Sequence, residues 1–187
     1  MTRDALITAL ADLIAPPSIR RVAVDGPDAA RKTTLADQLA ERVDSRRAVI
    51  RAGVDGFHRP SAVRRRRGSL SPEGCYHDTF DYAAVRHAVL DPLGPTGDRR
   101  YRTAVFDHST DQPVDEPPRT APDDALLIFD GVFLLRPELR QHWDIAIFVD
   151  IAEDETLRRA LVRDAAAMGG PARRWTSRAR RQRTGRN

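Results

Sequence analysis

Four short runs rich in apolar residues, none with strict polar alternation, occur along the chain. They cover residues 21–25, 47–55, 125–131 and 144–150. Strands that are buried on both faces read as nearly continuous apolar runs, which is typical of a parallel sheet covered by helices. The pattern therefore predicts an α/β fold of three layers with a mostly parallel central sheet.

Segments with apolar residues at helical spacing separate these strands. The predicted helices are an N-terminal helix within residues 1–16 and further helices at 33–43, 81–90 and 153–168. Gly169, Gly170 and Pro171 end the last of them. Residues 59–74 lack apolar periodicity and are predicted to form a mobile loop. Residues 91–123 are rich in proline, so no regular structure is expected there.

The charge of the chain is unevenly distributed. The 187 residues include 31 basic and 27 acidic ones, for a net charge of +4. The last sixteen residues contain seven arginines and no acid, so the rest of the chain is slightly acidic. We predict one domain over residues 1–171 and a disordered, arginine-rich tail over residues 172–187. This distribution argues against a nucleic acid as a partner, because arginine-rich tails of this kind are usually solvated.

Cysteine usage and hydropathy point to a cytoplasmic protein. Cys75 is the only cysteine, so no disulfide can form within the chain. Asp4 and Asp12 interrupt the N-terminal apolar pattern, and no run approaches membrane-spanning length. We therefore expect a cytoplasmic location and no membrane as a partner.

The stretch VAVDGPDAARKTTLA, residues 22–36, is nearly a phosphate-binding loop. Gly26, Lys32 and Thr33 fit the pattern G-x-x-x-x-G-K-[ST], whereas Arg31 replaces the second glycine. Lys32 is also the one lysine among the 31 basic residues. In such loops backbone N–H groups surround phosphates, the lysine reaches the β and γ phosphates, and the hydroxyl binds Mg²⁺. Asp130, at the end of the third predicted strand, is expected to hold that ion directly or through water; the alternative for Asp130 and Gly131 is an ordinary turn at the end of a strand.

Aspartates end three of the four predicted strands: Asp25, Asp55 and Asp130. Ligands of open α/β sheets bind at the carboxyl ends of strands, so these acids are expected to meet at one crevice. A phosphoryl-transfer enzyme needs a carboxylate that orients the acceptor hydroxyl and accepts its proton, and Asp55 is the candidate. The alternative for Asp55 is the turn cap that an Asp-Gly pair often forms.

Arginines recur on the last predicted helix at spacings of four and five residues. Arg158 or Arg159, together with Arg163, could place guanidinium groups over a transferring phosphate. The alternative is an ordinary solvated helix face.

Taken in order, six motifs resemble the uridine kinase and phosphoribulokinase family of P-loop kinases, particularly bacterial uridine kinase-like proteins. The resemblance extends from about residue 20 to about residue 170. The motifs are VAVDGPDAARKTTLA, VDGFHRP, YHDTFDY, RYRTAVFDHSTD, LLIFDGVFLL and DIAIFVDIAEDETLRRALVRD. The resemblance implies a three-layer P-loop NTPase fold with a mostly parallel sheet.

The resemblance also implies a reaction and roles for residues. The family transfers the γ phosphate of ATP, with Mg²⁺, to a primary hydroxyl of a nucleoside or a similar small alcohol. It assigns Asp55 the role of base beside the metal, and Arg163 a place in a lid. The residues implied to bind ATP are Gly26, Asp28, Ala29, Ala30, Arg31, Lys32, Thr33, Thr34 and Arg159. Those implied to bind the acceptor are Phe57, His58, Tyr101 and His108, and those near Mg²⁺ are Thr33, Asp130 and Asp55.

Two features depart from the family pattern. Arg31 at a position of positive φ is expected to cost about 1–2 kcal/mol and to crowd the phosphate, which weakens nucleotide binding. After residue 170 the arginine-rich tail replaces a family segment that includes another strand, so the tail resembles a truncated or frame-shifted end. We expect the sheet to lack its last strand, and the exposed apolar edge to favour homo-oligomers.

Three functions are compatible with these residues. The first is an ATP-dependent kinase of uridine type, impaired by Arg31 and the altered C-terminus. The second is a catalytically silent P-loop homologue that binds a ligand or regulates a partner. The third, an arginine-rich nucleic-acid binder, is opposed by the charge distribution. Candidate acceptors are uridine, cytidine, another nucleoside, a vitamin-like alcohol or a sugar.

Overall fold

The structure is a computed structural model that describes residues 2–152 and Arg158. The chain divides into two compact units. The first comprises Met1–Gly26 and Arg31–Val149, and the second comprises Pro27–Ala30 and Asp150–Asn187. The predicted domain boundary at 171, the arginine-rich tail and, apart from Arg158, the predicted helix at 153–168 lie outside the described residues.

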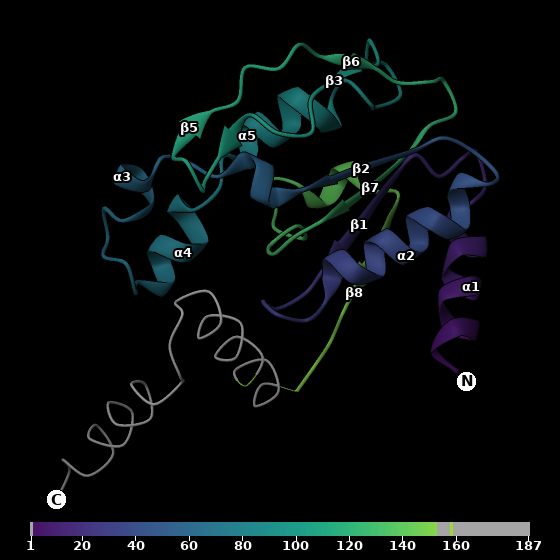
Figure 1. The fold of residues 1–187 in the computed structure, drawn as a ribbon, viewed down its shortest axis with the longest axis horizontal. Helices are drawn as coiled ribbons and strands as arrows, with labels where there is room; N and C mark the ends of the chain where they lie inside the picture. Colours follow the sequence, from purple (N-terminus) through teal and green to yellow (C-terminus); the bar gives the residue numbers. More distant parts are fainter. Residues whose placement is uncertain (1, 153–157, 159–187) are drawn as a thin grey trace, which may run out of the picture. The chain divides into compact units, whose positions relative to one another are not determined.

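A four-stranded parallel sheet lies at the centre of the first unit (Figure 1). Its order is β2-β7-β1-β8, and its strands are β1 (Arg21–Asp25), β2 (Val49–Gly53), β7 (Leu126–Asp130) and β8 (Ile145–Phe148). All pairings within it are parallel. β1 and β7 are buried at every residue because they are the two inner strands. The four strands and the parallel sheet that the sequence predicts are confirmed.

Helices cover both faces of this sheet, which gives the predicted three layers (Figure 1). On one face α1 (Arg3–Ile14) and α2 (Lys32–Asp44) bury Ile14 and Leu39 against Val22 and Ile128. On the other face lie α5 (Tyr82–Val85) and the π-helical turn Arg86–Leu90, which pack against residues such as Phe129. None of the helices in the described part of the chain is long and apolar enough to span a membrane.

The prediction that residues 59–74 and 91–123 lack regular structure was wrong. The first region contains α3 (Ser61–Arg64) and α4 (Pro72–Asp78). The second contains two antiparallel ladders, β3 with β6 and β4 with β5, built from β3 (Arg100–Tyr101), β4 (Phe106–Asp107), β5 (Gln112–Pro113) and β6 (Arg119–Thr120). Elements of two to seven residues are too short to show a hydrophobic period, so the pattern could not reveal them.

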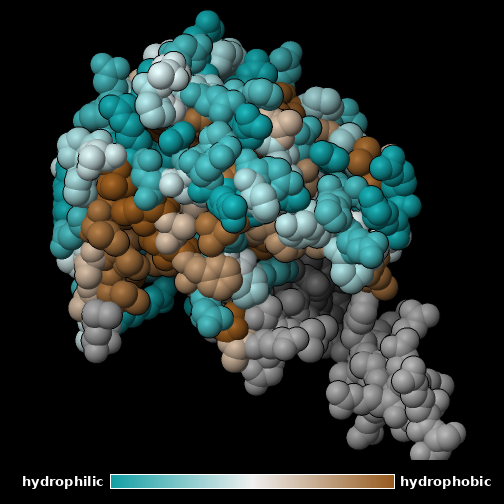
Figure 2. Space-filling view, turned by 180° about the vertical axis from the view of Figure 1, so that it is seen from behind, coloured by the Kyte–Doolittle hydropathy of each residue, from teal (hydrophilic) through white to brown (hydrophobic). Residues whose placement is uncertain are grey.

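Strand β8 forms one edge of the sheet among the described residues, where it pairs with β1 alone. Its side chains alternate between half-buried and exposed, and Phe148 is 57% exposed. Figure 2 shows hydrophobic residues gathered on the side that carries α1 and β8, and exposed Leu6 and Leu13 belong to α1. An exposed apolar sheet edge is therefore present. The predicted absence of a further strand concerns residues outside those described, and self-association stays a prediction.

Candidate active site

The helix at the end of the phosphate-loop motif begins at Lys32, one residue before its predicted start at residue 33. Lys32 is the first residue of α2 and is buried, while Thr33 and Thr34 follow in the exposed first turn. Gly26, at the end of β1, has a φ of 149°, and a Cβ there would lie 2.5 Å from the Val149 carbonyl oxygen. The motif therefore requires glycine at this position for space as well as for backbone conformation.

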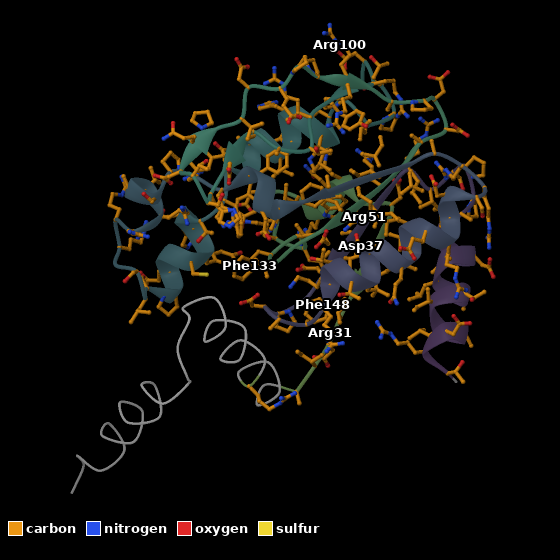
Figure 3. The ribbon with its side chains drawn as sticks, viewed as in Figure 1. Arg31, Asp37, Arg51, Arg100, Phe133 and Phe148 are labelled. Atoms are coloured by element: carbon orange, nitrogen blue, oxygen red, sulfur yellow. The ribbon has the colours of Figure 1, made fainter. Side chains whose placement is uncertain are left out.

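Arg31 has the positive φ that its place in the motif predicts. Its φ of 64° and ψ of 34° are left-handed, and the residue caps α2 without a side-chain hydrogen bond. The side chain is exposed (Figure 3). This conformation is unfavourable for a residue with a Cβ, so Arg31 strains the start of the helix.

The second unit contains the four middle residues of the loop. Ala29 also has a positive φ, 58°, and its N–H donates to the Asp28 carboxylate at 2.8 Å. The Ala30 N–H donates to the Pro27 carbonyl at 3.4 Å. The roles of Asp28, Ala29 and Ala30 in binding ATP stay predictions.

Thr33 and Asp130 meet where α2 begins and β7 ends. The Thr33 Oγ1 donates to the Asp130 Oδ2 at 2.5 Å. Gly53, which pairs with Asp130 in the β2–β7 ladder, lies beneath this carboxylate, because a Cβ on Gly53 would sit 3.2 Å from Asp130 Oδ1. The sheet register thus places a carboxylate and a hydroxyl together at the carboxyl edge of the strands.

These two oxygens fit a magnesium ion, which prefers hard oxygen ligands and keeps several waters or phosphates. Within residues 2–152, no group of three or more His, Cys, Asp or Glu side chains could hold a metal alone. Thr33 and Asp130 are therefore the residues in the described part of the chain that would hold the ion.

Arg51 is a site residue that the sequence analysis missed. It lies in β2, and its Nη2 is 2.8 Å from Asp130 Oδ1 and 3.0 Å from Asp37 Oδ1 on α2 (Figure 3). The guanidinium also donates to the carbonyl oxygens of Ile128 and Ala52 at 2.6 and 3.2 Å. A charged residue inside an otherwise apolar strand was the available signal, because such a residue needs a buried partner.

Asp25 corrects the expectation that the three strand-end acids meet at one crevice. Its carboxylate is buried and accepts the Gly26 N–H at 2.7 Å and the Leu135 N–H at 3.0 Å. Both oxygens therefore serve the backbone, and Asp25 joins the start of the phosphate loop to the segment after β7.

Asp55 lies in a 3₁₀ turn, Val54–Phe57, directly after β2. Its side chain is exposed, and its carbonyl oxygen accepts a hydrogen bond from His58 Nδ1 at 2.9 Å. The Phe57 ring is fully buried and lies 6.1 Å from the Phe129 ring, so it packs in the core under the turn. The turn thus directs Asp55 to solvent at the sheet edge that also carries Asp130.

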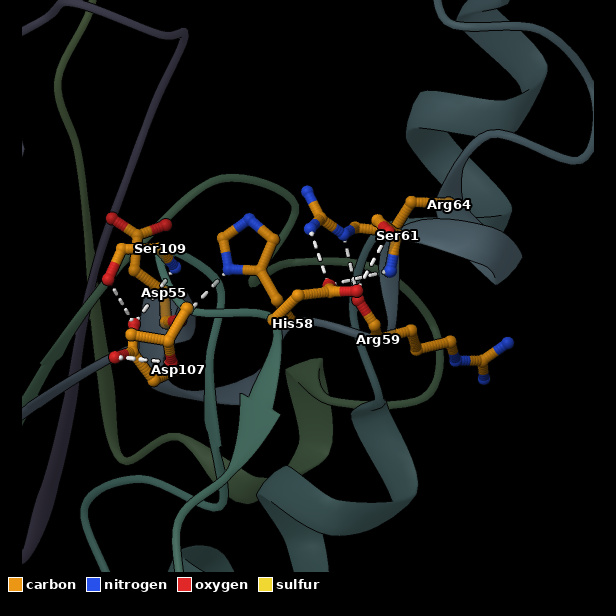
Figure 4. A network of polar contacts seen from close by, with 9 residues as sticks. Asp55, His58, Arg59, Ser61, Arg64, Asp107 and Ser109 are labelled. Carbon is orange, nitrogen blue, oxygen red and sulfur yellow. Dashed lines mark hydrogen bonds and ion pairs between the residues drawn. The ribbon is translucent and has the colours of Figure 1, made fainter.

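His58 lies between the β4–β5 hairpin and α3 (Figure 4). Its ring stacks on His108 of the hairpin, with centroids 4.4 Å apart, and lies 4.6 Å from the Phe80 ring. The hairpin is fixed to α3 because Asp111 accepts the Ser61 N–H and hydroxyl at 2.8 and 2.7 Å. Two of the predicted acceptor residues, His58 and His108, are therefore adjacent.

Hydrogen bonds keep the acids of this hairpin ionised. Bonds from Ser109 and Thr110 lower the pKa of Asp107 to about 2. Bonds from Ser61 lower the pKa of Asp111. Both carboxylates are consequently charged at any physiological pH and serve as fixed acceptors that hold the hairpin in shape.

Burial lowers the pKa of His58 below its ordinary value of 6.5. The neighbouring His108 and Arg64 lower this pKa further, whereas Asp55, through its carbonyl hydrogen bond and its carboxylate, acts in the opposite direction. The unfolded chain therefore binds a proton more readily, so stability contributed by neutral His58 is present above pH 6.5 and is lost as the pH falls below it. We expect His58→Gln to flatten this part of the stability curve. Urea unfolding at pH 7.5, 6.5 and 5.5 measures the difference, and a histidine pKa at or above 6.5 by NMR for His58 would contradict it.

The remaining predicted residues are separate from this cluster or outside the described residues. Tyr101, in β3, is nine-tenths buried and belongs to the core that contains α5. Arg158 is helical and exposed. Arg159 and Arg163, predicted to contact phosphate, lie outside the described residues, so their roles stay predictions.

Comparison with known protein families shows to which family the chain belongs. The sequence model of the phosphoribulokinase / uridine kinase family matches residues 22–179. The chain belongs to this family. The resemblance in the six motifs is thereby confirmed, and the family is one of kinases that bind nucleotides.

One curated relative in the family is uridine-cytidine kinase B of Dictyostelium discoideum. It is 32% identical over 150 residues, which cover 79% of this chain. The matched region covers 59% of that relative, so the chain spans little more than half of the relative's length.

Solved structures show the same fold. A candidate uridine kinase of Bacillus stearothermophilus superposes with a TM-score of 0.69 at 22% identity, covering 85% of this chain and 87% of its own. A candidate fructose transport system kinase of Silicibacter sp. TM1040 superposes with a TM-score of 0.73 at 24% identity, covering 96% of this chain and 89% of its own. The predicted P-loop NTPase fold is confirmed.

Proposed function

We propose that this family member is an ATP-dependent kinase that moves the γ phosphate to a primary hydroxyl of a nucleoside of uridine type or a similar small alcohol. The observation that carries the proposal is the hydrogen bond of 2.5 Å between Thr33 and Asp130, directly after Lys32 at the start of α2. Family membership gives the reaction class, and this arrangement retains the groups that the reaction needs.

The phosphate side of the site is built on the start of α2. The backbone N–H groups at a helix N-terminus carry its partial positive charge, which favours phosphate. Lys32 adds a compact ammonium to this end of the helix. Thr33 and Asp130 are the residues that would hold Mg²⁺, which when bound neutralises phosphate charge.

The acceptor side is built on the turn after β2 and on the hairpin. We assign Asp55 the task of orienting the acceptor hydroxyl and accepting its proton, because its exposed carboxylate follows the strand that pairs with β7 at Asp130. The stacked rings of His58 and His108 offer a flat face to the acceptor. A flat face suits a nucleobase, which supports a nucleoside over a sugar.

The test is Mg²⁺-dependent transfer of labelled γ phosphate from ATP to a panel of uridine, cytidine, purine nucleosides, sugars and small alcohols. The proposal expects transfer to uridine or cytidine above that to sugars. Transfer to sugars alone would overturn the nucleoside assignment. Silence on every acceptor, with folding confirmed by circular dichroism, would favour the second candidate, a silent homologue that binds a ligand.

Arg31→Gly tests whether Arg31 impairs the binding of ATP at the phosphate loop. Glycine adopts positive φ without strain, so we expect this variant to bind ATP several-fold more tightly and to gain up to about 1 kcal/mol in its free energy of unfolding. Calorimetric titration with ATP and urea unfolding measure the two effects. If ATP affinity does not change, Arg31 does not obstruct the loop, and the expectation of weakened binding is wrong.

A further inference from the structure

Arg51 touches the proposed metal carboxylate directly, although it comes from a different strand. Successive residues of β2 point to opposite faces of the sheet, and Arg51 points to the face covered by α2, where Asp37 lies. Its side chain is three-quarters buried, at 24% exposure. It therefore reaches Asp130 through the interior edge of the sheet and not from solvent.

The two oxygens of Asp130 are both occupied by donors. Oδ2 accepts the Thr33 hydroxyl at 2.5 Å, and Oδ1 accepts Arg51 Nη2 at 2.8 Å. Asp130 is also nearly buried, with 11% of its side chain exposed. A guanidinium paired with a buried carboxylate fixes the direction of that carboxylate, and the pair offers a cation much less net negative charge than an unpaired carboxylate does.

Contacts with backbone carbonyls and with the Asp37 carboxylate hold Arg51 in place independently of Asp130. Nη1 donates to the Ile128 carbonyl oxygen at 2.6 Å, and Nε and Nη2 both approach Asp37 Oδ1 at 3.0 Å. The guanidinium thus spans β2, β7 and α2. With the bond from Nη1 to the Ala52 carbonyl oxygen at 3.2 Å, the guanidinium has four such contacts. An arginine anchored in this way cannot leave easily when a cation approaches, so its positive charge remains beside the site.

We propose that Arg51 is a positioning residue of the metal site: it fixes the direction of the Asp130 carboxylate and offsets its charge, so that the site binds a divalent cation only together with nucleotide phosphate. The inference rests on the proposed function for the nucleotide, but its central claim concerns the cation alone. Without phosphate oxygens, one hydroxyl and one neutralised carboxylate are too weak a ligand set. The phosphates supply the missing negative charge.

The test measures the affinity of the full chain for Mn²⁺ in the absence of nucleotide. Mn²⁺ is used in place of Mg²⁺ because it gives an electron paramagnetic resonance signal. We expect the wild-type chain to bind Mn²⁺ weakly and Arg51→Gln to bind it about tenfold more tightly or better, because removal of a neighbouring positive charge favours the cation. The matched control is Arg46→Gln. Arg46 also pairs with an aspartate, Asp12 at 2.7 Å, but follows the opposite end of α2. The Arg46→Gln variant should bind Mn²⁺ with the affinity of the wild type.

Double variants locate the gained binding. Arg51→Gln frees both Asp37 and Asp130, so each is replaced by asparagine in that background. The proposal expects Asp130→Asn to abolish the gained binding and Asp37→Asn to leave most of it. Gained binding that depends on Asp37 alone, or equal Mn²⁺ affinity in wild type and Arg51→Gln, would overturn it. If Arg51→Gln fails to fold, Arg51→Met replaces it as the neutral variant, and Arg51→Lys, which keeps the charge, should retain weak binding.

A non-hydrolysable ATP analogue then tests the coupling between metal and nucleotide. In wild type the analogue should tighten Mn²⁺ binding strongly, whereas in Arg51→Gln the same addition should tighten it about tenfold less. If Arg51 had a purely structural role, the analogue would tighten Mn²⁺ binding by the same factor in wild type and in Arg51→Gln. Tighter Mn²⁺ binding by Arg51→Gln with no phosphate transfer by any variant would refute the kinase function and keep the inference, so the two failures are distinguishable.

Discussion

Replacement of Asp55 by asparagine is expected to lower kcat for phosphoryl transfer by about 10²–10⁴-fold, because the amide cannot accept the proton of the acceptor hydroxyl. Asp55 is exposed and lies in a short 3₁₀ turn, so asparagine fits the same backbone and folding should not change. ATP affinity should also stay close to that of the wild type. Steady-state kinetics with the best acceptor of the panel, with ATP binding measured by calorimetry, separates the two quantities.

Asp44→Asn is the matched control for this variant. Asp44 is an exposed aspartate at the last residue of α2, far from the carboxyl edge of the sheet, and its amide variant should keep full activity. If Asp55→Asn retains more than a tenth of wild-type kcat, Asp55 does not act as the base. Its Asp-Gly pair would then have the alternative role, a turn cap.

Replacement of Lys32 by methionine should reduce kcat/KM by about 10²–10³-fold, the usual effect of removing one charge that stabilises a transition state. Methionine keeps the length and apolar stem that the buried position needs, so the variant tests the charge and not the packing. Kinetics in parallel with Glu41→Gln, which removes an exposed charge later in the same helix, checks that the loss is specific.

Lys32→Arg sharpens this test. The chain uses arginine at every other basic position, and the guanidinium is larger and planar, so we do not expect it to restore the activity. Full activity of Lys32→Arg would show that any positive charge suffices here, which contradicts the requirement for a compact ammonium.

The sheet and the phosphate side of the site could be predicted because their signals are local. Continuous apolar runs identified β1, β2, β7 and β8, and the spacing from Gly26 to Thr33 identified the start of α2. Asp130 could be placed at the carboxyl edge of the sheet because it ends such a run. Each of these inferences needs only neighbours in sequence.

The contacts that the sequence analysis missed join residues that become neighbours only in the folded chain. Arg51 and Asp37 are fourteen residues apart and meet through the packing of α2 on β2. Asp25 shares its strand-end position with Asp130, yet its carboxylate binds backbone N–H groups of two segments that only the tertiary fold brings together. The β3–β6 ladder joins residues about twenty apart across a proline-rich segment, where pairing and not periodicity stabilises the strands.

The Asp25 carboxylate has a consequence for motion. One buried charged group accepts N–H donors from Gly26 and from Leu135, and hydrogen bonds to a charged group are among the stronger ones in proteins. The entry to the phosphate loop and the chain that leaves β7 are therefore fastened to each other. A rearrangement that accompanies ligand binding must carry these two points as one rigid body, so a hinge can lie only on either side of them.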